Sequence, residues 1–175
     1  MDCLEAILAR YSYRGCYKET AVPRDDLRRI MQAGLSAPSG CNKQTTSLIG
    51  VDDPVLLETL GREMRVPSFA TAPAAICVLT QPIPAFRQTR FNVQDYSAAI
   101  ENMLVAITAM GYASCWVEGD ITTHEGVGAR MAGHLGVPDG YEVVAYLPVG
   151  VPAEEGPRAQ HKPFEERAWF NGYRA

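Results

Sequence analysis

Two short, almost uninterrupted apolar runs constrain the fold of this chain more than any other feature of its sequence. They cover residues 74–80 and 143–149. Their length suits buried strands, and it falls far below the roughly 18 apolar residues that a membrane-spanning helix needs. Because helical patterns separate the two runs, we expect a layered domain that mixes helices and strands, of the α+β or α/β class.

Apolar residues at helical spacing predict the helices between these runs. The first helix opens with a capping box, Asp2-x-x-Glu5, and carries a stripe of Leu4, Ile7 and Leu8. Other helices are expected to open at Pro23 and Pro54 and to cover residues 95–110 and 125–135. Further short strands are expected at residues 47–51 and 112–117, and a long exposed loop at residues 81–94.

Nothing in the sequence divides the chain into parts. Its 175 residues contain no internal repeat, low-complexity tract or linker, so we expect a single domain spanning residues 1–175. The tail, residues 152–175, is polar but ends with the aromatic residues Phe164, Trp169, Phe170 and Tyr173. Aromatic side chains on a polar tail predict that it docks on another surface, such as a partner subunit.

Charge and cysteine content narrow the possible partners and the compartment. A net charge of −4 gives no general attraction to nucleic acid or to an anionic membrane. The five cysteines form no C-x-x-C pair, and their odd number cannot close into a complete set of intrachain disulfides. The three histidines show no metal-ligand spacing. We therefore expect a soluble cytoplasmic protein without a metal site.

Three segments carry residues suited to binding chemistry. In the first, Arg10-x-Ser12-x-Arg14, an extended backbone would put all three side chains on one side, where they suit a phosphate. Taken alone, these arginines are more often surface ion-pair partners. The second segment is a loop at residues 37–44, and the third is the strand end at residues 114–119. Each alone is a weak signal, but their order and spacing are more specific.

Together the three segments resemble those of the nitroreductase family. The resemblance also includes Val22-Pro23, the segment at residues 147–152 and the Lys162-Pro163-Phe164-Glu165-Glu166 motif, so it covers nearly the whole chain. It implies an α+β sandwich with a central, mostly antiparallel sheet flanked by helices. It further implies an intertwined homodimer that binds FMN non-covalently, each site being built by both subunits. One departure is Thr45-Thr46, where the family motif often has Pro-Trp.

The resemblance assigns roles to individual residues. Arg10 and Ser12 would meet the FMN phosphate, and Arg14 would face the pyrimidine edge of the ring, where a cation stabilises reduced flavin. Lys162 would complete the phosphate site, with His161 and Arg158 as alternatives. The loop around Pro38 would reach the flavin of the other subunit, and a backbone N–H near Glu118 and Gly119 would meet N5. The full set of implied FMN-binding residues is Arg10, Tyr11, Ser12, Arg14, Pro38, Ser39, Gly40, Asn42, Gln44, Trp116, Val117, Glu118, Gly119 and Lys162.

The function implied by the resemblance is that of an FMN-dependent oxidoreductase. NADH or NADPH would reduce the flavin and leave, and a nitroaromatic or quinone would then take the electrons in a ping-pong reaction. The protein would contribute positioning and electrostatics rather than a catalytic acid or base. Two alternatives remain open: a flavin-binding or sensing protein without turnover, and a specialised flavin enzyme that carries out reductive dehalogenation or flavin breakdown.

Overall fold

Three antiparallel strands form the centre of the chain in the computed structural model, which describes residues 1–173. In spatial order they are β1 (Thr46–Val51), β2 (Ala74–Thr80) and β3 (Glu142–Val149). Every residue of β2 is buried, which explains why this strand is an apolar run rather than an alternating pattern. The predicted α+β class and both predicted core strands are confirmed.

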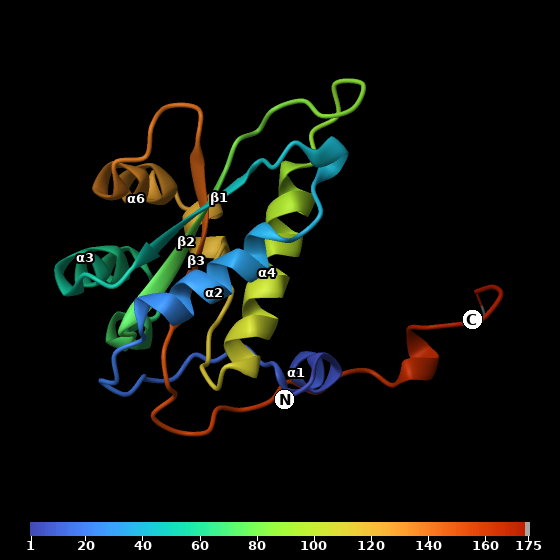
Figure 1. Cartoon of the computed structure of the whole chain (residues 1–175), viewed down its shortest axis with the longest axis horizontal. Coiled ribbons are helices and arrows are strands. Elements are labelled where there is room, and N and C mark those ends of the chain that lie inside the picture. The colour runs from blue at the N-terminus through green and yellow to red at the C-terminus, as the bar shows by residue number, and fades with distance from the viewer. Residues whose placement is uncertain (174–175) are drawn as a thin grey trace.

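Helices cover both faces of the sheet (Figure 1). One face is covered by α2 (Arg24–Leu35) and α4 (Asn92–Ala109). The other face is covered by α3 (Pro54–Glu63), α5 (Gly119–Thr123) and α6 (Val127–Leu135). Side chains of β2 alternate between the two layers, with Ile76 packing toward α4 and Cys77 toward α3. The sheet is therefore the middle layer of three.

The segment at residues 112–117, for which we predicted a strand, forms isolated bridges instead. These bridges pair Ala113 with Gly150, Ser114 with Ser12, and Val117 with Tyr146. Because the backbone groups of this segment are shared among three different neighbours, no continuous ladder forms. The short helix α5, which follows it, was not predicted. The next helix begins at Val127 rather than at residue 125, because Gly126 has a left-handed conformation with a φ of 77°.

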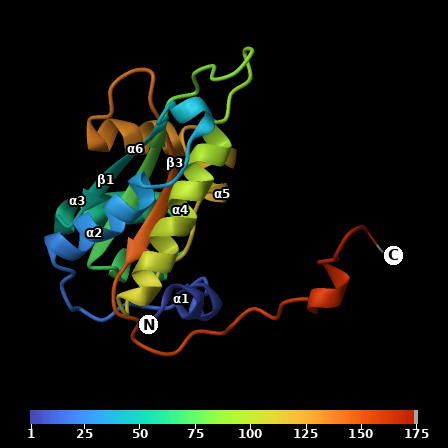
Figure 2. The same cartoon turned by 45° about the vertical axis from the view of Figure 1, so that its right-hand side comes forward.

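Two terminal segments lie at the edge of the domain or beyond it. Helix α1 (Cys3–Ala9) has the predicted capping box, but its apolar residues Leu4, Ile7 and Leu8 are exposed and do not enter the core. The C-terminal segment, residues 158–173, leaves the body of the domain and extends away from it in both views (Figures 1 and 2). Within residues 1–173 no helix is long and apolar enough to span a bilayer.

Candidate functional site

The arginine segment that follows α1 runs beside residue 114. Tyr13 anchors it: its ring is fully buried, and its backbone N–H donates to the Ser114 carbonyl at 2.8 Å. Because side chains alternate along an extended backbone, burying Tyr13 turns its neighbours on either side toward the opposite face. Arg10, Ser12 and Arg14 accordingly line one cavity, as the sequence predicted.

This arginine pocket has a volume of about 470 Å³ and is closed on one side by the start of the C-terminal segment. Arg158 and His161 belong to its lining. The Arg158 guanidinium donates to the Ala9 carbonyl at 2.8 Å and lies 4.9 Å from the centre of the Tyr11 ring. Lys162 is exposed and lies 4.0 Å from Glu166, outside the lining. The C-terminal cation in the pocket is therefore Arg158.

The pocket concentrates positive charge on a chain whose net charge is −4. Three arginines, Arg10, Arg14 and Arg158, share one cavity of small-molecule size. One carboxylate offsets part of this charge, since Glu101 of α4 lies 3.2 Å from the Arg10 guanidinium. Such a local cluster suits an anionic group that arginine can bind through two parallel hydrogen bonds, such as a phosphate.

The Cys115 thiol is buried in the segment that runs beside the arginine segment. Burial raises the pKa of the Cys115 thiol, whereas Arg14, Ser12 and Arg10 act in the opposite direction. The bridge between Ser12 and Ser114 joins the arginine segment to the start of the segment at residues 114–119. The structure therefore brings together two of the three segments singled out in the sequence.

The Glu118 side chain is held by two donors. Its two carboxylate oxygens accept from the Tyr96 hydroxyl at 2.8 Å and from Trp116 Nε1 at 2.9 Å. Burial, together with the hydrogen bond to Glu118, raises the pKa of Tyr96 so that its phenol remains a donor. A Cβ placed on Gly119 would meet no atom within 4 Å, so space is open beside the backbone at the start of α5.

The loop that precedes β1 has an unusual backbone. Gly40–Asn42 forms a single 3₁₀ turn, and φ is positive at Cys41 (51°), Asn42 (53°) and Gln44 (50°). A left-handed conformation costs about 1–3 kcal/mol for a residue with a side chain. Surrounding contacts must therefore hold this loop in place.

Asp95 on the first turn of α4 supplies those contacts, and sequence reasoning missed it. Its side chain is buried, with 4% of its surface exposed, and its two oxygens accept from the Gly40 N–H at 2.7 Å and the Thr45 hydroxyl at 2.6 Å. The Gln44 N–H donates to the Ser39 hydroxyl at 3.0 Å. Thr45, noted above as a departure from the family motif, has a hydroxyl donor that proline at this position would lack.

Within one chain, this loop lies apart from the arginine pocket. The loop and α1, which leads into the arginine segment, lie at opposite ends of α4 (Figures 1 and 2). Pro38, Ser39 and Gln44 line a separate cavity of about 310 Å³, which shares no residue with the arginine pocket. The arginine-pocket residues and the loop residues therefore form two separate groups in the isolated chain. Glu118 lies in neither cavity and bonds Tyr96 on the helix turn that holds the loop.

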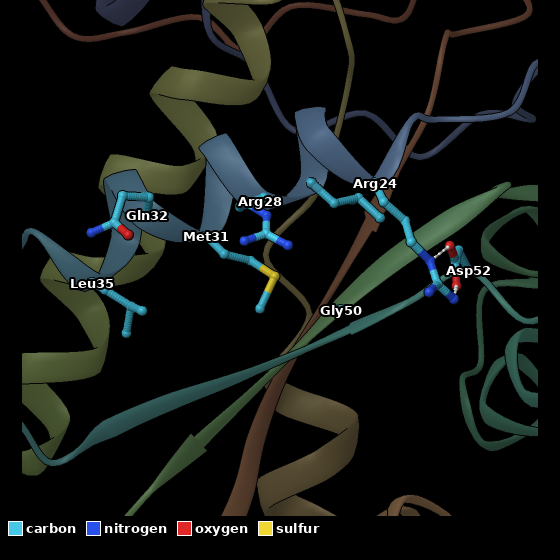
Figure 3. A pocket seen from close by; sticks show the side chains of 8 residues that line it. Arg24, Arg28, Met31, Gln32, Leu35, Gly50 and Asp52 are labelled. Atoms are coloured by element: carbon cyan, nitrogen blue, oxygen red, sulfur yellow. Dashed lines mark hydrogen bonds and ion pairs between the residues drawn. The ribbon is translucent and has the colours of Figure 1, made fainter.

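A further groove, between α2 and β1, contains none of the predicted site residues (Figure 3). Met31 of α2 projects over Gly50, Leu35 lines the groove farther along α2, and Arg24 donates to both carboxylate oxygens of Asp52 at 2.5 and 2.8 Å. The hydrogen bond from Arg24 lowers the pKa of Asp52. Because Asp52 already binds Arg24, this ion pair is a structural link between α2 and the end of β1.

Comparison with known proteins identifies the family of this fold and pocket. The model of the family described as "Nitroreductase family" matches residues 7–65 and 57–151. The chain belongs to the nitroreductase family. In this member of the family, the match includes the arginine segment, the loop before β1 and residues 114–119. The C-terminal segment with Arg158 and Lys162 lies beyond it.

Relatives within the nitroreductase family match this chain along most of its length. A protein of Archaeoglobus fulgidus named "Putative NADH dehydrogenase/NAD(P)H nitroreductase" is 31% identical over 155 residues, which cover 88% of this chain and 87% of that protein. A crystal structure of a nitroreductase with bound FMN from Bacteroides fragilis is 27% identical, with a TM-score of 0.80, and covers 98% of this chain and 100% of that one. An FMN-dependent nitroreductase from Clostridium difficile shares the fold at 23% identity, with a TM-score of 0.82 and coverage of 97% and 99%.

Proposed function

We propose that this nitroreductase family member is an FMN-dependent oxidoreductase that takes reducing equivalents from NAD(P)H. It passes them to a small electron-poor acceptor, a nitroaromatic or a quinone, in ping-pong order. The observation that carries the proposal is the arginine pocket, which Arg10, Ser12 and Arg14 line together. Ser12 pairs with Ser114 at the start of the segment that leads to Glu118 and Gly119. The relative with bound FMN supports it.

The residues of the arginine pocket fit FMN by charge and by shape. Arg10 and Ser12 offer charge-assisted and hydroxyl hydrogen bonds to the phosphate, and Arg158 adds a third group from the C-terminal segment. Arg14, two residues beyond Ser12 on the same side, is placed to reach the pyrimidine edge of the ring. The open space beside Gly119 leaves room for a flat ring against the backbone. Lys162 stays a candidate for the phosphate site in the assembled protein.

When bound, FMN supplies hydride transfer at N5 of its ring. The chain would contribute binding and orientation: the backbone N–H near Glu118 and Gly119 would donate to N5, and Arg14 would stabilise negative charge at the pyrimidine edge of the ring. The Glu118 carboxylate accepts from Tyr96 and Trp116, so its role is to hold the backbone rather than to transfer a proton.

The proposal includes a homodimer, because each chain holds only part of a site. The loop of Pro38, Ser39, Gly40, Asn42 and Gln44 lies apart from its own arginine pocket, so it completes the pocket of a second copy. The exposed apolar residues of α1 support such an assembly, since Leu4 is 71% exposed and Leu8 83%. A largely apolar groove between α1 and α4, lined in part by Ile7 and Val105, continues this surface.

The experiment that tests the function is an anaerobic titration of the purified protein. We expect a yellow protein whose oxidised-flavin absorbance is bleached by NADH or NADPH and returns when a quinone or a nitroaromatic compound is added. A colourless protein that also fails to take up added FMN would refute the proposal. Reduction without turnover in an acceptor screen would favour the sensing alternative. Destruction of the flavin itself under oxygen would favour the breakdown enzyme.

A further inference from the structure

Two consecutive residues on the first turn of α4 contact the two halves of the candidate site. Asp95 and Tyr96 are both buried, each with 4% of its surface exposed. Neighbouring residues on a helix point about 100° apart, so their side chains diverge. Asp95 accepts from the Gly40 N–H and the Thr45 hydroxyl, whereas Tyr96 donates to Glu118.

The loop before β1 is attached to the start of α4 at two points. The first is the pair of hydrogen bonds to Asp95. The second is steric: a Cβ on Gly40 would lie 2.6 Å from the Phe91 ring, so the loop backbone packs directly against the residue that precedes α4. With three left-handed residues between Gly40 and Thr45, this geometry persists only while those contacts hold it.

Residues 116–118 are attached to the same helix turn by a single side chain. The Tyr96 hydroxyl donates to one oxygen of Glu118, and Trp116 donates to the other. Glu118 in turn accepts through its carbonyl from the Ile121 N–H at 2.9 Å, which starts α5. The Tyr96 hydroxyl and the backbone bridge between Val117 and Tyr146 therefore both hold the backbone that leads into residues 118 and 119.

We propose that Asp95 and Tyr96 are positioning residues for two different flavins of the dimer. Asp95 holds the loop that contacts the flavin bound by the partner subunit. Tyr96 holds the backbone that contacts the flavin bound by its own chain. This inference rests on the proposed function, because it requires FMN and a site shared by two subunits. A substitution of Asp95 should therefore affect the flavin bound by the other subunit. A substitution of Tyr96 should affect the flavin bound by the chain that carries the substitution.

Mixed dimers with one functional arginine pocket test this assignment. One chain, the blank chain, carries Arg10→Ala and Arg14→Ala so that it holds no flavin, and the other chain, the holding chain, keeps its arginines. Different affinity tags on the two chains isolate the mixed dimer. Asp95→Asn, Tyr96→Phe or the matched control Ser97→Ala is then placed in either chain. Ser97 lies on the same helix turn, and its hydroxyl bonds only the Val93 carbonyl within α4.

The readouts are the FMN dissociation rate and the midpoint potential of the one remaining flavin. Asp95→Asn in the blank chain is expected to accelerate FMN dissociation about tenfold, and in the holding chain less than about twofold. Tyr96→Phe is expected to show the reverse pattern, with a shifted potential only when it lies in the holding chain. Ser97→Ala is expected to change neither quantity in either position.

A purely structural role for these residues gives a different result. Equal effects from both placements, or no effect from either, would overturn the inference. If Asp95→Asn prevents assembly, the milder Thr45→Val removes one of the two hydrogen bonds to Asp95 and must follow the same blank-chain pattern. The proposed function fails separately, when the wild-type dimer binds no FMN or when the double arginine variant still binds two.

Discussion

At the scale of single residues, one buried tyrosine decides what the arginine segment can do. Tyr13 fills the core with its ring, and its hydroxyl donates to the Cys16 carbonyl at 2.5 Å. The extended backbone then presents Arg10, Ser12 and Arg14 to one cavity, which Tyr11 also lines. Local sequence was enough to predict this convergence, because it depends only on neighbours within five residues.

Substitution of Arg14 tests the role of this side chain at the ring edge. Arg14→Ala is expected to raise the FMN dissociation constant about tenfold, since it removes a charge-assisted contact. It is also expected to lower the flavin reduction potential, because a cation beside the pyrimidine edge stabilises the reduced form. Fluorescence titration and a spectroelectrochemical titration measure the two quantities. Arg62→Ala is the control, because Arg62 pairs with Glu58 on the surface of α3. Unchanged affinity and potential would remove Arg14 from the site.

At the scale of elements, the core strands and most helices could be predicted, whereas the short helix α5 and the pairing of residues 112–117 could not. The helix starting after Pro23 and the strand at residues 74–80 follow from periodicity and from apolar runs. The segment at residues 112–117 has the composition of a strand. Its backbone partners, however, come from Ser12, Tyr146 and Gly150, which lie far away in the sequence. Backbone pairing with several distant partners leaves no pattern in the local sequence.

The C-terminal segment, residues 158–173, carries a prediction at this scale. Phe170 is 77% exposed in the single chain, so Phe170→Asp should change the stability of the isolated fold little. If the segment docks on a partner, the same change places a charge in an apolar contact and weakens the dimer at least about tenfold. Sedimentation velocity over a concentration series measures this. Val55→Asp on α3 is the matched control, at 73% exposure. Equal dimer affinities for the two variants would contradict docking by Phe170.

At the scale of the whole molecule, the structure separates the arginine pocket of one chain from the loop before β1. The arginine pocket is built by the end of α1, residues 10–14 and the start of the C-terminal segment, and the loop held by Asp95 lies at the other end of α4. The proposed dimer brings the arginine pocket of one chain together with the loop of the other.

Dilution tests this dependence of flavin binding on assembly. Because each proposed site needs two chains, dilution that separates the subunits is expected to release FMN over the same concentration range. Flavin fluorescence, which rises on release, and the dimer fraction measured by mass photometry should therefore follow one curve. FMN that stays bound at concentrations where the chains are single would show that one subunit is sufficient.

The sequence by itself determined the fold class, the core strands, most helices and the convergence of Arg10, Ser12 and Arg14. These features depend on periodicity and on neighbouring residues, which a linear pattern records. Only the tertiary structure decided that Arg158 rather than Lys162 lines the pocket, and that Asp95 holds the loop before β1. Asp95 and Gly40 lie 55 residues apart, and Arg158 and Ala9 lie 149 apart. Such contacts arise from how the helices pack on the sheet, which local sequence does not encode.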